Sequence, residues 1–151
     1  MTDKDTVATL NDLIETSKDG EYGFNACAEH LRDTSLKQSM LTRAAECRTA
    51  VTELQGLVVQ HGGDAATHGS AAGAVHRGWV AVKGTLSGYS DVAVLDECER
   101  GEDVAMDKYR AALQKELPPA VRTLVERQYE GVKRNHAQVR MLRNQARASK
   151  A

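Results

Sequence analysis

Four stretches of the chain repeat their apolar residues at alternating spacings of three and four, and this repeat constrains the fold more than any other feature. The stretches run from Val7 to Leu31, from Leu36 to Val58, from Val92 to Leu113 and from Val121 to Leu142. Such spacing gathers apolar side chains on one stripe of an α-helix, which is buried when helices pack side by side. Helices of roughly 26 to 30 residues would be about 40 to 45 Å long. The sequence therefore predicts an all-α bundle of four long helices.

Residues that begin and end helices stand at the breaks between these stretches. The glycine pair at 62–63 is expected to end the second helix, and the proline pair at 118–119 separates the last two. The third helix is expected to reach about Glu116. The predicted N-terminal caps are Thr2 or Asp3 for the first helix and Ser90 or Asp91 for the third, and Asp33, Thr34 and Ser35 supply stop and cap residues before the second.

The connections between helices differ in length, and this difference predicts their directions. The short break at 33–35 makes the first two helices an antiparallel hairpin. About 30 residues separate the second and third helices, enough to return along the bundle and make these two parallel, as in ferritin-like folds. Residues 75–86 of this crossover keep an apolar stripe and predict a short extra helix. We expect one ferritin-like domain over residues 1–151, with a basic tail that frays from about residue 146.

Charge and composition favour a protein of the cytoplasm. The 20 Lys and Arg residues nearly balance the 21 Asp and Glu residues, so no strong field attracts nucleic acid or a membrane surface. No apolar stretch approaches the roughly 20 residues of a membrane-spanning helix, and the first residues lack a signal-peptide core. The three cysteines lack zinc-type spacing and are typical of reduced thiols. We expect no nucleic-acid partner and no membrane contact.

Two carboxylates in the segment ECERGED lie on the apolar stripe of the third helix. Glu99 and Glu102 should therefore face the bundle interior, where a carboxylate is costly unless it is paired, metal-bound or protonated. Counting residues along each helix from the turns places Glu21, Glu46 and His136 at nearly the same depth. Glu46 and His136 are each one step off the apolar stripe of their helix.

Three explanations of this polar layer stay open. In the first, the five residues bind a divalent metal such as iron, manganese or zinc, because oxygen ligands with one imidazole suit these ions. In the second, Lys133 neutralises the acids without a metal. In the third, the helices rotate so that the acids reach solvent. The Glu-x-x-His pairs of di-metal bundles are incomplete, because Thr49 follows Glu46 and Lys133 precedes His136 at the third place.

Several separated segments resemble a known family. LNDLIETSKDGEYGF, HGGD, HGSAAGAVHRGW and ERGEDVAMDKYRAAL are similar to the bacterial ferritin-like four-helix-bundle family known as domain of unknown function 2383. The resemblance extends from about residue 6 to about residue 145. It implies a ferritin-like bundle and a stress-related role without an established activity. The family motif positions that it implies are Asp19, Gly20, Glu99, Glu102 and the group His76, Arg77 and Trp79.

Two functions of different class follow from these observations. The first is a metal-binding or degenerate di-metal carboxylate protein with a stress-protective role, whose ligands are Glu21, Glu46, Glu99, Glu102 and His136. The alternative is a non-enzymatic structural or interaction bundle with a metal-free Glu/Lys layer. The sequence contains no nucleophile elbow, phosphate loop or dinucleotide fingerprint, so no catalytic residue is assigned. The glycine-rich helix around His76, Arg77 and Trp79 is the expected contact between two copies of the chain.

Overall fold

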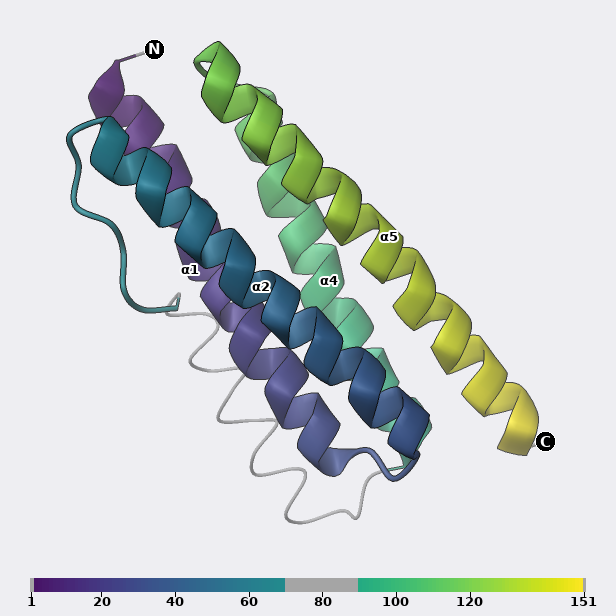
Figure 1. Ribbon diagram of the computed structural model, residues 1–151. Helices are drawn as coiled ribbons and strands as arrows, with labels where there is room; N and C mark the ends of the chain where they lie inside the picture. Colours follow the sequence, from purple (N-terminus) through teal and green to yellow (C-terminus); the bar gives the residue numbers. More distant parts are fainter. Residues whose placement is uncertain (1, 70–89, 151) are drawn as a thin grey trace.

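Four long α-helices make up the part of the protein that the structure, a computed structural model, describes: residues 2–69 and 90–150 (Figure 1). The helices are α1 (Asp3–His30), α2 (Thr34–Gln60), α4 (Asp91–Leu113) and α5 (Pro119–Lys150). No strand occurs in these two ranges. The predicted all-α bundle of four long helices is confirmed. The predicted extra helix, with His76, Arg77 and Trp79, lies outside the described residues.

The predicted helix starts are confirmed by local hydrogen bonds. The Thr2 hydroxyl accepts a bond from the Asp5 backbone N–H at 3.1 Å, and the Asp5 carboxylate accepts from the Thr2 backbone N–H at 3.3 Å. Asp33 caps α2 and Ser90 caps α4, each by accepting from a backbone N–H three residues later. These caps satisfy donors that a helix start leaves unpaired, and each typically contributes about 1 kcal/mol.

The helix ends follow the expected chemistry with one difference. Gly62, just after α2, has a φ of 75°, a left-handed conformation that glycine adopts without strain. The α4 helix ends at Leu113, earlier than the predicted end near Glu116. Beyond it, the Lys115 backbone N–H donates to the Ala112 carbonyl, and Nη2 of Arg122 donates to the Leu113 carbonyl, so these groups leave the α-helical bonding pattern. Pro119 is then the first residue of α5.

The helix directions match the predicted crossover. In Figure 1, α1 and α2 run antiparallel, α4 runs parallel to α2, and α5 runs parallel to α1. The backbone N–H groups of Arg32 and Asp33 donate to the Asp91 carboxylate at 2.8 and 3.2 Å. The turn between α1 and α2 therefore lies at the same end of the bundle as the start of α4. Helix α1 packs against α2 and α4, and α5 packs against α4. Helices α2 and α5 are also neighbours, and their contact is the least extensive of the four neighbouring pairs.

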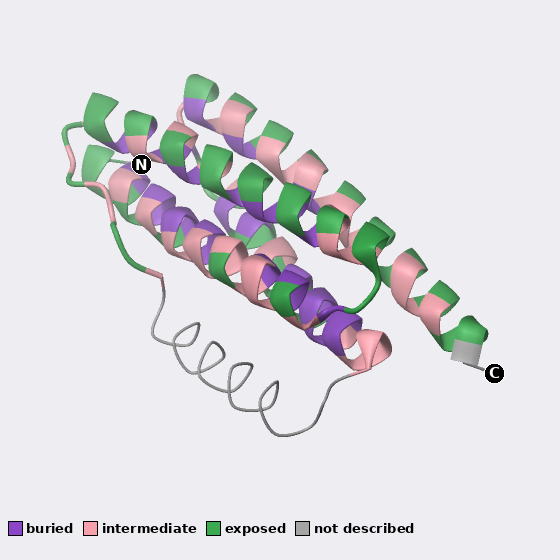
Figure 2. Cartoon of the chain, turned by 60° about the horizontal axis from the view of Figure 1, so that its bottom comes forward, coloured by how far each residue is buried: buried purple, intermediate pink, exposed green. Residues whose placement is uncertain are grey.

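Buried side chains fill the interior in two apolar clusters, one toward each end of the bundle, and Figure 2 shows buried residues on the inner faces of the helices. The first includes Leu13, Leu54 and Val121, and the second includes Phe24 and Leu95. Polar groups occupy the middle section between them. None of the described helices is both long and apolar enough to cross a membrane.

Candidate functional site

Helix α4 carries buried acids in the middle section of the bundle. Glu99 is 8% exposed and Glu102 only 1% exposed. The prediction that both face the interior is confirmed. Gly101, between them in sequence, lies on the outer side of the helix and is exposed.

Glu102 forms an ion pair with an arginine from α2. Arg43 donates from Nε to Oε1 of Glu102 at 2.7 Å, and both side chains are buried. The guanidinium carbon lies 5.4 Å from the centre of the Phe24 ring, within reach of a cation–π interaction. Burial raises the pKa of Glu102, and the charge and hydrogen bond of Arg43 oppose this rise. The pair therefore keeps a carboxylate in an apolar interior.

Glu99 forms ion pairs with two arginines of α5. Arg143 donates from Nη1 to Oε2 of Glu99, and Arg140 places Nε 3.6 Å from Oε1. The prediction that Lys133 neutralises the buried acids is wrong. Lys133 pairs with Glu130 at 2.7 Å, one turn earlier on α5, and its side chain is 41% exposed. The metal-free ionic layer is thus built from arginines.

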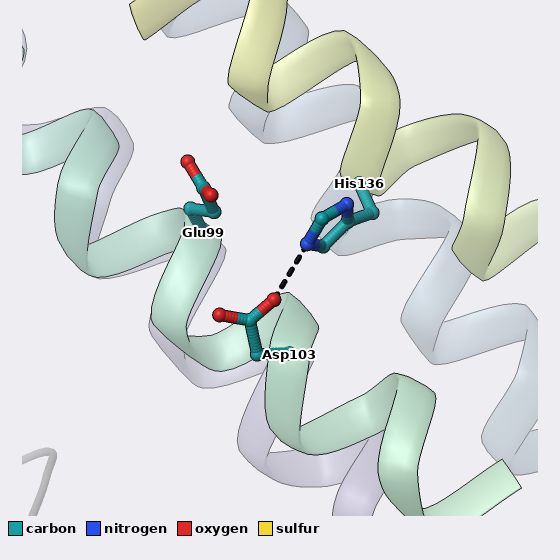
Figure 3. Close-up of side chains that lie close together, drawn as sticks. All are labelled: Glu99, Asp103 and His136. Carbon is teal, nitrogen blue, oxygen red and sulfur yellow. Dashed lines mark hydrogen bonds and ion pairs between the residues drawn. The ribbon is translucent and has the colours of Figure 1, made fainter. Parts of the chain in front are cut away.

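A second set of side chains lies between α4 and α5 (Figure 3). Glu99, Asp103 and His136 each offer one ligand atom, and these three atoms lie within 4.8 Å of one another. Nε2 of His136 is 2.6 Å from Oδ1 of Asp103. Glu99 is buried, His136 is partly buried and Asp103 is exposed, so the set is accessible from the surface.

The set arises from simple helical spacing. Asp103 follows Glu99 by four residues and therefore lies on the same side of α4. His136 faces both from α5. Glu99 and His136 were predicted from the sequence, and Asp103 was not. The four-residue spacing from Glu99 was the signal that would have found it.

The other predicted ligands have partners elsewhere. Glu21 accepts from Nε of Arg48 at 2.9 Å, and Glu46 accepts from Nδ2 of Asn135 at 3.4 Å. Glu102 is occupied by Arg43. The structure therefore brings Glu99 and His136 together with Asp103, and a metal-ligand role for Glu21, Glu46 or Glu102 stays a prediction.

Comparison with known proteins gives a family but no function. The sequence model of the family described as Domain of unknown function (DUF2383) matches residues 5–115. This range includes most of α1 and all of α2 and α4, and it ends before α5. Glu99 and Asp103 lie inside the matched range and His136 lies beyond it. No curated protein matches the sequence. Because the match covers most of the chain, the protein belongs to the DUF2383 family.

Proposed function

We propose that the protein binds a divalent transition-metal ion between α4 and α5 through Glu99, Asp103 and His136. The observation that carries this proposal is the convergence of two carboxylate oxygens and one imidazole nitrogen within 4.8 Å. Mixed oxygen and nitrogen ligands suit iron, manganese or zinc. Three protein ligands at an accessible surface leave positions for water, which permits exchange of the ion. Such a site fits metal buffering, the form of stress protection that we propose for this ferritin-like bundle.

Charge supports the proposal. Two carboxylates and a neutral imidazole give the ligand set a charge that a divalent ion cancels. His136 already points Nε2 at Asp103, so the ion would replace a proton between these two groups. Because a ligating imidazole must be deprotonated, acid should compete with the metal. Arg140 and Arg143 hold Glu99 in place and also moderate the affinity, since positive charge disfavours a nearby cation.

The test is metal binding by chelator-treated protein, measured by calorimetry with Zn²⁺ and Mn²⁺. Wild type should bind one ion per chain, and His136→Ala should lose that binding. His61→Ala is a matched control, because His61 also contacts an aspartate, Asp3, at 3.1 Å but has no third ligand beside it among the described residues. Equal binding by the two variants would refute the site. Loss of binding in Glu21→Ala would instead support the wider predicted ligand set.

A second function is favoured by the arginine pairs. Arg43 pairs with Glu102 and Arg143 pairs with Glu99 without any metal. This favours a non-enzymatic structural or interaction bundle. The same measurement separates the two functions: a structural bundle shows no stoichiometric metal binding. It also shows no rise in melting temperature when metal is added, whereas a ligand at 100 times its Kd stabilises a protein by about 2.7 kcal/mol.

A further inference from the structure

A cavity of about 400 Å³ lies inside the bundle. Glu99, Asp103 and His136 are not among its lining residues. All four described helices line it, with Gly23 from α1, Arg43 from α2, Glu102 from α4 and Val132 from α5 among the lining residues. It occupies the middle section between the two apolar clusters. Its volume falls within the range of small-molecule sites.

The cavity reaches the surface between α2 and α5. Glu46 of α2 and Arg134 of α5 both line it and are both exposed. Among neighbouring helices, these two make the least extensive contact. Glu46 is hydrogen-bonded to Asn135. Arg134 forms no ion pair with any residue in the two described ranges, so it offers an uncompensated positive charge at this opening.

A glycine of α1 leaves room in the cavity. Gly23 lines the cavity and is only partly exposed, and a Cβ added there would meet no heavy atom within 4 Å. Glycine in the middle of a helix is less favourable than alanine. A bundle that needed only a packed core would gain helix stability from larger residues here. The space is therefore maintained against the local preference of the helices.

The polar centre of the cavity is the guanidinium of Arg43, which uses only part of its hydrogen-bonding capacity. An arginine has five N–H donors, one on Nε and four on the two Nη nitrogens. Nε of Arg43 is bonded to Glu102, and neither Nη nitrogen has a hydrogen bond within the described part of the chain. Oε2 of Glu102 is buried without a partner. Glu102 thus occupies one edge of the guanidinium and leaves its outer end for another acceptor.

We propose that this cavity binds a small monocarboxylate with an apolar body. The two oxygens of a carboxylate match the paired Nη nitrogens of an arginine, and such bidentate contacts are strong and directional. Phe24, Cys47, Cys98 and Val132 are buried lining residues that can enclose an apolar body. Arg134 attracts the anion to the opening. The unbonded Nη donors of Arg43 suit one carboxylate, and apolar walls disfavour a strongly hydrated phosphate.

Calorimetric titration with octanoate tests the proposal, with octanamide as a neutral compound of equal length. Chelator-treated protein is used throughout, so that a bound metal cannot coordinate octanoate. We expect one octanoate per chain with a Kd below about 1 mM. Octanamide should bind at least about tenfold more weakly, since it lacks the charge that pairs with Arg43. Equal affinity for both compounds, or no octanoate binding by wild type, overturns the proposal.

Two kinds of variant locate the binding. The double variant Arg43→Gln with Glu102→Gln removes both charges together and should weaken octanoate at least about tenfold. Gly23→Leu fills the cavity and should weaken octanoate to a similar degree. Gly56→Leu is its matched control, because Gly56 is an exposed α2 glycine outside the cavity whose added Cβ also meets nothing within 4 Å. If the double variant does not fold, the octanoate affinities of Gly23→Leu and Gly56→Leu still test the proposal. An unchanged affinity in Gly23→Leu overturns it.

Discussion

At the scale of single residues, the buried pair of Arg43 and Glu102 is the most sensitive contact in the molecule. Arg43→Ala would leave Glu102 charged and unpaired in the interior, which typically costs about 3–5 kcal/mol. Urea unfolding at neutral pH measures the loss. Arg48→Ala is the matched control, because Arg48 is an α2 arginine that also bonds a glutamate through Nε but is 67% exposed. That control should cost no more than about 1 kcal/mol.

The same variant has a defined pH dependence. Burial raises the pKa of Glu102 above its ordinary value of 4.5, so the folded chain holds this proton more tightly than the unfolded chain. The stability contributed by the tighter protonation of Glu102 is therefore fully present at low pH. It is lost as pH rises through the pKa of Glu102 in the folded state. Without Arg43 the pKa rises further, so the stability gap between Arg43→Ala and wild type should narrow on acidification. A gap that stays constant from pH 7 to about pH 4.5 would contradict this account.

The three cysteines should be inert in the folded protein. Burial raises the pKa of Cys47 to about 12 and the pKa of Cys98 well above its ordinary value, and the reactive species is the thiolate. Titration with a thiol reagent at neutral pH should label native protein slowly and label all three cysteines quickly after unfolding in guanidinium. Rapid labelling of the native protein would indicate that the reagent enters the cavity that Cys47 and Cys98 line and reacts there despite their raised pKa.

At the scale of helices, the cap of α2 sets where the first hairpin turns. Asp33→Ala removes the side-chain acceptor for the Leu36 backbone N–H and should cost about 1 kcal/mol. Ser35→Ala, two residues later in the exposed first turn, should change stability by less than about 0.5 kcal/mol. Thermal unfolding of both variants measures the difference. Equal stability would show that the α2 start does not depend on its cap.

Helix existence and helix starts were predictable because their causes are local. Apolar spacing defines a stripe within one helix, and Asp33 or Ser90 satisfies donors only three residues away. The end of α4 was less predictable. The sequence still allowed helix as far as about Glu116, and the structure turns after Leu113.

Ion partners were less predictable because they depend on how each helix rotates about its axis. Lys133 was one candidate cation for the buried layer, because it stands three residues before His136, yet α5 turns it outward to Glu130. Arg43 lies three residues after Met40 and four before Cys47, both buried, so its own stripe indicated an inward position. The inward position of Arg43 could therefore be predicted from the sequence. Its pairing with Glu102 on another helix could not.

At the scale of the whole molecule, the four helices are not equally close to their neighbours. The helix pairs α1–α2, α1–α4 and α4–α5 pack closely, and α2 and α5 leave the cavity opening between them. Helix α5 lies beyond the range that the family model matches. It nevertheless supplies His136 to the proposed metal site and Val132 to the cavity wall. Both proposals therefore depend on how α5 docks against α4.

The parallel direction of α2 and α4 also separates the two ends of the chain. With tight connections throughout, a fourth helix would return the chain to the end where it began. Here α5 runs in the same direction as α1, so residues 2 and 150 lie at opposite ends of the bundle (Figure 1). The 28 residues of α1 set this separation at about 40 Å or more. Energy transfer between a donor dye and an acceptor dye on the two ends would thus report whether the bundle is intact. Copies of the chain fused head to tail would extend along one axis.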